Sequence, residues 1–152
     1  MLMRWLLAAL HLLPLGIGLG AVLWRGVSLR GPLDRVALQR VFLADTLWGV
    51  AAVLWIVTGL MRVFGGYEKD TDYYLHNGAF LLKMILLVLI IILEIWPMVT
   101  LIQWRVRQGN QTLTDTSAAS TIARICWIQS ALVVVMIFAA TAMARGLWAG
   151  TW

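Results

Sequence analysis

Six ionisable side chains interrupt long apolar stretches of this 152-residue sequence, and their types indicate what chemistry the chain is able to support. A neutral imidazole is the commonest protein ligand of metals and of haem iron, while lysine and arginine bind carboxylates through charge-assisted hydrogen bonds. Aspartate and glutamate pair with the same cations. The six residues form two sets, which are His11, Arg62 and Lys83 in the first and Asp45, Glu94 and Arg124 in the second.

The composition around these residues is that of a membrane protein. Hydrophobic residues make up 62% of the chain, charged residues make up 12%, and the mean hydropathy is +0.87. A soluble domain has about 25% charged residues, so a free cytosolic enzyme is excluded. The net charge is +5, but most cations are arginines that flank apolar runs. This distribution favours contact with lipid headgroups and excludes nucleic acid as a partner.

Four apolar segments are long enough to cross a bilayer as helices. They span residues 5–24, 42–64, 79–102 and 122–144. A helix rises 1.5 Å per residue, and about 20 residues cover a hydrocarbon core roughly 30 Å thick. The segments lack the alternating pattern of membrane-spanning strands. We therefore predict an all-α membrane protein, in which residues 1–152 form one integral membrane domain with four transmembrane helices in an up-down bundle.

Arginines in the loops predict the orientation of this bundle. The connection between the first two segments carries Arg25, Arg30, Arg35 and Arg40, and the connection between the last two carries Arg105 and Arg107. Loops rich in lysine and arginine stay in the cytoplasm. We expect a multi-pass protein of the bacterial inner membrane with both termini on the outer, periplasmic side.

The two sets of ionisable residues lie at two depths in the predicted bundle. His11, Arg62 and Lys83 lie near the outer ends of three segments, and the other set lies near the inner ends. Lys83 and Glu94 are eleven residues apart, which is three helical turns plus about 20°, so they share a face. A charge at the bilayer centre costs at least about 2.5–3.5 kcal/mol. We expect both to face the interior, with Glu94 paired to Arg124 or Arg40.

Glycines suggest where the helices pack. Gly16 and Gly20 form a G-x-x-x-G pattern, which allows close helix approach in lipid. We interpret it as a packing face inside the bundle, with a dimer interface as the alternative.

His11 is the residue whose surroundings point furthest beyond packing. Pro14 leaves the Leu10 carbonyl without its helical donor. Gly18 lies seven residues after His11 on the same helical face, and its lack of a side chain leaves space there. The alternative is a histidine hydrogen-bonded to a neighbouring helix. His76 precedes the third segment, and we interpret it as an interfacial polar residue.

Several chemistries lack their motifs. The sequence contains no GxSxG, Walker loop, HExxH, CxxC or CxxCH pattern, so hydrolase, ATPase, zinc protease and covalent haem attachment have no support. With two histidines and one cysteine, a four-ligand zinc site is not expected. We interpret the lone Cys126 as a small buried hydrophobic residue.

The run Ala9-Leu10-His11-Leu12-Leu13, the four spans and a lysine at the start of the third span resemble HemJ-type protoporphyrinogen oxidases and their CopD-like relatives. The whole chain resembles small bacterial inner-membrane families of unknown function related to that group. The resemblance implies binding of haem b or porphyrin near His11 and Lys83, which match the family's first-helix histidine and third-helix lysine. Leu81 and Glu94 stand where HemJ proteins have histidines, so protoporphyrinogen oxidation itself is not expected.

Three functions are compatible with these features. The first is a b-type haem or redox protein, in which His11 is the axial iron ligand and Lys83 and Arg62 bind the haem propionates. The second is a non-enzymatic accessory subunit of a membrane complex, such as a respiratory complex, whose partners are other subunits or further copies of the chain. The third is a small transporter or proton relay through Glu94, Asp45 and Lys83.

Overall fold

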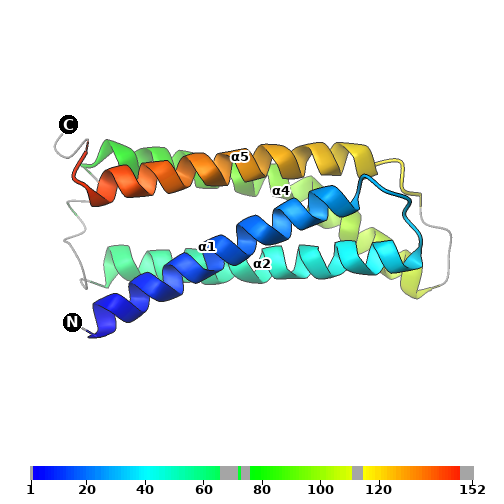
Figure 1. Ribbon diagram of the computed structural model, residues 1–152, viewed down its shortest axis with the longest axis horizontal. Coiled ribbons are helices and arrows are strands. Elements are labelled where there is room, and N and C mark those ends of the chain that lie inside the picture. The colour runs from blue at the N-terminus through cyan, green and yellow to red at the C-terminus, as the bar shows by residue number, and fades with distance from the viewer. Residues whose placement is uncertain (1, 66–71, 73–75, 111–114, 148–152) are drawn as a thin grey trace.

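The computed structural model describes residues 2–65, 72, 76–110 and 115–147. Its helices are α1 (Leu2–Ser28), α2 (Arg35–Phe64), α4 (Gly78–Gly109) and α5 (Ala119–Ala144), as Figure 1 shows. All four are long and apolar enough to cross a membrane. The prediction of an all-α membrane protein with four transmembrane helices is confirmed.

Polar residues cap the first turns of α2 and α4. Asp34 caps α2, and its carboxylate accepts a 2.7 Å hydrogen bond from the backbone N–H of Ala37. This cap satisfies a donor that the first helical turn leaves without a partner. Asn77 caps α4 in the same way, since its side-chain oxygen accepts from the N–H groups of Ala79 and Phe80. As a result α2 begins seven residues before the apolar segment that starts at residue 42.

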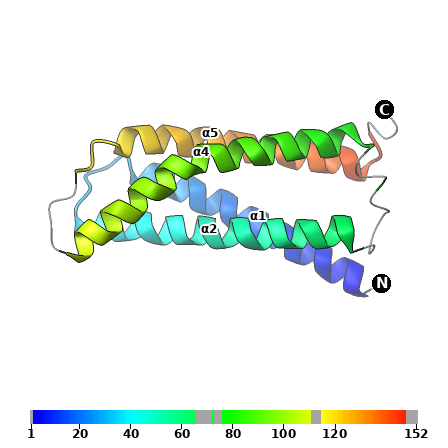
Figure 2. The same cartoon turned by 180° about the vertical axis from the view of Figure 1, so that it is seen from behind.

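The four helices run alternately up and down, so the start of α1 and the end of α5 lie at the same end of the bundle (Figures 1 and 2). We call this the terminal end. The opposite end, where α1 leads into α2 and α4 leads towards α5, is the loop end. α1 packs along α2 and also against α5, α4 packs along α5, and α2 and α4 touch over a short length.

Helix α4 changes direction near its middle, as Figure 2 shows. Pro97 lies inside this helix. Proline has no N–H to donate to the carbonyl of Leu93, and its ring crowds that carbonyl, which is a standard cause of a helix kink. Through this bend α4 lies beside α5 at the terminal end and approaches α2 at the loop end.

The outward surface of the bundle is apolar. Only 22–33% of the most hydrophobic stretch of each helix is buried within the protein. Leu89 and Ile92 on α4, for example, are 42% and 58% exposed. A soluble protein could not leave four such surfaces in water, so the lipid bilayer is the medium that covers them.

The packing glycines are not the predicted pair. Gly16 and Gly20 are exposed, and a Cβ atom built at either would meet nothing within 4 Å. The close approaches are made at Gly18, where a Cβ would lie 3.4 Å from Ala51, and at Gly26, where it would lie 3.0 Å from Cys126. Residues two positions apart on a helix are rotated by about 200°, so the interior face holds Gly18 and turns Gly16 and Gly20 outward.

Candidate functional site: a pocket and a buried ionic cluster

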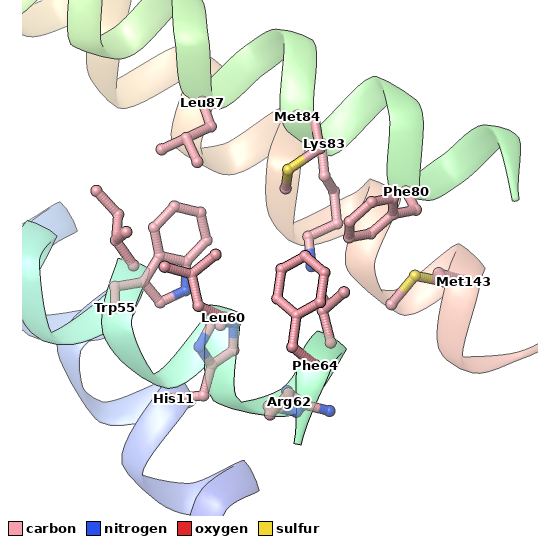
Figure 3. Close-up of a pocket in the computed structure, with 13 residues that line it drawn as sticks. His11, Trp55, Leu60, Arg62, Phe64, Phe80, Lys83, Met84, Leu87 and Met143 are labelled. Atoms are coloured by element: carbon pink, nitrogen blue, oxygen red, sulfur yellow. The ribbon is translucent and has the colours of Figure 1, made fainter. Parts of the chain in front are cut away.

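A pocket of about 290 Å³ lies at the terminal end, and all four helices line it. Figure 3 shows how its side chains converge from different helices. α1 contributes His11, α2 contributes Arg62 and α4 contributes Lys83. The structure thus brings the first set of predicted site residues to one cavity, although they are far apart in the sequence. We call it the terminal pocket.

The imidazole of His11 is held on several sides. It is 8% exposed, and its Nδ1 lies 2.9 Å from the hydroxyl of Thr58 on α2. Its ring stacks on the indole of Trp55, with ring centroids 5.5 Å apart and planes inclined by 20°. A Cβ at Gly59 would lie 3.2 Å from the imidazole Cε1, so a glycine at that position leaves room for the ring. These contacts fix the imidazole in the wall of the terminal pocket.

Two cations add positive charge to the same pocket. Lys83 is 9% exposed, and its side chain reaches from α4 across the cavity towards α2 (Figure 3). Arg62, half-buried, lines the cavity from the last turn of α2. In a medium of low polarity these charges attract carboxylates or other anions much more strongly than they would in water.

The rest of the lining is aromatic, aliphatic and thioether in character. Met84 of α4 and Met143 of α5 each place a sulfur-containing side chain there. Leu60 and Phe64 also line the pocket but are 52% and 69% exposed, so they form its mouth. The cavity therefore combines an apolar lining with an imidazole and two cations.

A second assembly of ionisable groups lies nearer the loop end, and Arg25 is its centre. The Arg25 side chain is fully buried. One of its terminal nitrogens, Nη1, donates to Asp45 at 2.8 Å and to Glu94 at 2.7 Å. The other, Nη2, donates to the second oxygen of Glu94 at 2.7 Å and to the side-chain oxygen of Gln129 at 3.2 Å. The Nε atom donates to the sulfur of Cys126 at 3.2 Å.

These contacts use all five N–H donors of the guanidinium and reach all of the helices. Arg25 belongs to α1, Asp45 to α2, Glu94 to α4, and Gln129 and Cys126 to α5. A guanidinium has five donors in a rigid planar fork. We call this assembly the Arg25 cluster.

Further hydrogen bonds hold the two carboxylates of the Arg25 cluster. The Gln129 amide donates to Glu94 at 2.8 Å and to the Ile90 carbonyl at 3.3 Å. Arg105 donates to the second oxygen of Asp45 at 3.1 Å. With Arg25 and Arg105 against Asp45 and Glu94, the formal charges balance, which is the condition for burying charge in an apolar medium.

The structure corrects the predicted partners of this cluster. Glu94 was expected to pair with Arg124 or Arg40, but both of these side chains are exposed, and Arg25 occupies the centre of the cluster instead. Arg25 was expected in a cytoplasmic loop, whereas α1 continues past it to Ser28. One signal in the sequence does locate Arg25. It lies one further seven-residue step along the helical face that carries His11 and Gly18.

Sequence reasoning also missed the polar residues that support both assemblies. Thr58 and Gln129 carry no charge, so nothing in the sequence distinguishes them from residues that pack passively. Cys126 is buried as predicted, at 1% exposed, but its sulfur also accepts a hydrogen bond from Arg25.

An apolar layer separates the terminal pocket from the Arg25 cluster. Lys83 and Glu94 both line interior cavities, and their spacing of eleven residues corresponds to about 16 Å along α4. A cavity of about 80 Å³ lies between them and shares Trp55 and Leu87 with the terminal pocket. Within the described part of the chain, no group of three or more histidine, cysteine, aspartate or glutamate side chains is arranged to hold a metal ion.

These features define a four-helix integral membrane protein with a ligand-sized pocket at one end and a neutralised ionic cluster towards the other. The family described as "Predicted membrane protein (DUF2214)" matches residues 3–147, so the chain belongs to this family. No curated protein and no solved structure matches the chain.

Proposed function

We propose that the terminal pocket binds haem b, with His11 as an axial ligand of the iron, and that the protein has a redox role in the membrane. One observation carries the proposal. An imidazole and two cations, from three different helices, line a single cavity that is otherwise aromatic, aliphatic and thioether in character. The sequence resemblance to haem-related membrane families points to the same residues.

The donor chemistry of the pocket fits this group. Thr58 engages Nδ1 of His11, which leaves Nε2 as the ring nitrogen for a ligand. Met84 and Met143 offer thioether sulfur, the donor that accompanies histidine in many cytochromes. The cavity volume of about 290 Å³ lies just below the range of about 300–1,000 Å³ for ligand pockets. A porphyrin ring would therefore have to extend past Leu60 and Phe64, whose side chains are exposed, towards the lipid.

Each residue of the pocket has a role that follows from its chemistry. His11 supplies the lone pair, and Trp55 and Thr58 hold its ring in place. Lys83 and Arg62 bind anionic substituents through charge-assisted hydrogen bonds. The apolar lining excludes water. Haem b, when bound, supplies reversible one-electron transfer.

The test is an absorption spectrum of the purified protein in detergent during titration with ferric haem. We expect a Soret band that saturates near one haem per chain. The variant His11→Ala should lose the axial-ligand spectrum, whereas His76→Ala, which changes the chain's exposed histidine, should retain it. Lys83→Ala should weaken haem retention roughly 10- to 100-fold, the worth of a charge-assisted hydrogen bond, without changing the ligation spectrum.

Two results would overturn the haem proposal. One is a full spectrum from His11→Ala, and the other is a wild-type protein that shows no spectrum after haem supplementation. In the second case an accessory subunit of a membrane complex becomes the better hypothesis, and co-purification of other membrane subunits is the measurement that supports it.

The contacts of the Arg25 cluster support a structural role for Asp45 and Glu94 rather than a proton relay. Both carboxylates accept hydrogen bonds on each of their oxygens. These bonds tie each carboxylate to donors on neighbouring helices, which is what a structural ion-pair network requires.

We also propose that the terminal end faces the periplasmic side of a bacterial inner membrane. The support is the arginine content of the loop end, which positive-inside topology places in the cytoplasm. Reporter fusions at the C-terminus and at Gly31 should give opposite readings. A C-terminal fusion that is active only in the cytoplasm would reverse the assignment.

A further inference from the structure

The hydrogen bonds around Thr58 determine which nitrogen of His11 carries the proton. The Thr58 hydroxyl lies 2.7 Å from the backbone carbonyl of Leu54 and 3.1 Å from that of Trp55. Both carbonyls can only accept, so the single hydroxyl hydrogen of Thr58 is donated to one of them. If the hydroxyl instead donated to His11, two oxygen atoms would face each other at 2.7 Å with no hydrogen between them.

The Thr58 oxygen must therefore accept the remaining bond, and its partner is Nδ1 of His11 at 2.9 Å. An acceptor at that position requires a hydrogen on Nδ1. In a neutral imidazole only one nitrogen carries hydrogen, so Nε2 keeps its lone pair. The tautomer follows from this network, because hydrogens themselves are inferred from their partners.

We propose that Thr58 is a positioning residue that holds His11 in the Nδ1–H tautomer, and that the terminal pocket consequently selects ligands that accept an electron pair. Applied to the proposed function, on which this selectivity rests, the pocket prefers a metalloporphyrin over a metal-free porphyrin. A metal-free porphyrin has the same ring and the same carboxylates but offers no vacant metal position to Nε2.

The surroundings of His11 support a single ring orientation. The ring is stacked on Trp55 on one face, and its Cε1 edge lies against Gly59. A ring that flipped about its Cβ–Cγ bond would move Nδ1 away from Thr58 and leave that hydroxyl oxygen without its donor. The loss of one buried hydrogen bond costs about 1–3 kcal/mol, which is enough to favour one orientation.

The tautomer is measured without any ligand. The chain has two histidines, so ¹⁵N–¹H correlation spectra of the ¹⁵N-histidine-labelled protein in detergent resolve both imidazoles, and His11→Ala assigns the signals. We expect wild-type His11 to be protonated on Nδ1 and bare on Nε2. Thr58→Ser keeps the hydroxyl and should give the same pattern, whereas Thr58→Val removes it and should populate the Nε2–H tautomer.

Thr100→Val is the matched control for this series. The Thr100 hydroxyl also donates to the carbonyl four residues earlier, that of Trp96 at 2.9 Å, and among the described residues it has no hydrogen bond to a histidine. This variant should leave the His11 signals unchanged. Apart from His11, the described partners of the Thr58 hydroxyl lie on its own helix, so Thr58→Val should fold, and the helical content of each variant checks this.

The selectivity is measured with zinc protoporphyrin and metal-free protoporphyrin as probes. Wild type and Thr58→Ser should bind the zinc compound more tightly. Thr58→Val should weaken zinc protoporphyrin binding roughly 10- to 100-fold, the usual effect of losing the group that orients a metal-binding histidine, and should leave binding of the metal-free compound unchanged.

The tautomer measurement and the porphyrin binding measurement test different parts of the proposal. A wild-type His11 protonated on Nε2 would overturn the role of Thr58, whatever the protein binds. The expected tautomer together with equal binding of both porphyrins would overturn the selectivity alone. The expected tautomer with no binding of either porphyrin would overturn both the selectivity and the haem proposal, while the positioning role of Thr58 would stand.

Discussion

The terminal pocket and the Arg25 cluster contain similar ionisable side chains but differ in what surrounds those side chains. Each gathers ionisable side chains from several helices inside an apolar bundle. In the cluster, the guanidinium of Arg25 is fully buried and every donor has a protein acceptor. In the pocket, the side chains of His11 and Lys83 border about 290 Å³ of unfilled space. The difference is that one assembly is filled by the protein itself and the other leaves a volume for a ligand.

The contacts of the Arg25 cluster are those of a structural ion-pair network. The guanidinium of Arg25 binds both oxygens of Glu94 through its two terminal nitrogens. Because its other donors reach α2 and α5, the cluster stabilises the packing of all four helices. The terminal pocket instead places an imidazole and two cations around a cavity. Three predictions test this contrast, from the largest expected effect to the smallest.

The largest effect is expected from Arg25→Met. This change removes the cation and leaves the carboxylates of Asp45 and Glu94 buried beside each other. Breaking a buried ion pair by removing one partner costs about 3–5 kcal/mol, so the melting temperature in detergent should fall by about 10 °C or more. Arg124→Met, at an exposed arginine of α5, is the control and should change it little. Equal melting temperatures of the two variants would show that the Arg25 cluster does not stabilise the fold.

A smaller effect separates the two acids of the cluster. Glu94 accepts three hydrogen bonds within the cluster, two from Arg25 and one from Gln129, whereas Asp45 accepts one from Arg25 and one from the half-exposed Arg105. Hydrogen bonds to charged groups contribute about 1.5–3 kcal/mol. Glu94→Gln should therefore lower the melting temperature more than Asp45→Asn. Equal losses, or a larger loss from Asp45→Asn, would contradict the bidentate arrangement.

The smallest effect concerns the wall of the terminal pocket. Gly59→Ala places a methyl group 3.2 Å from the His11 ring, and the ring must shift by a few tenths of an ångström. Alanine improves helix propensity by about 1 kcal/mol over glycine, and this crowding should cancel the gain. At Gly49 on the same helix an added Cβ would meet nothing within 4 Å, so Gly49→Ala should retain the gain in stability. Identical melting temperatures for the two variants would show that His11 does not press on Gly59.

The fold follows from the sequence because length and hydropathy alone decide whether a helix crosses a bilayer. The predicted segments all became helices, and only their ends differ. Asp34, for example, caps α2 seven residues before the apolar segment begins. The meeting of His11 and Lys83 follows in part from the same reasoning. Membrane helices run roughly parallel, so position along the sequence sets depth, and residues at equal depth become neighbours when they face inward.

Rotation about each helix axis and the choice of partners were decided only by the tertiary structure. The sequence determines that charges in lipid must be neutralised, but not which cation neutralises which acid, because several arginines lie within reach of the same depth. Packing around Gly18 and Gly26 turns α1 so that Arg25 points inward and Gly16 and Gly20 face the lipid. That rotation, which depends on the contacts of all four helices at once, places Arg25 among the acids and His11 against Thr58.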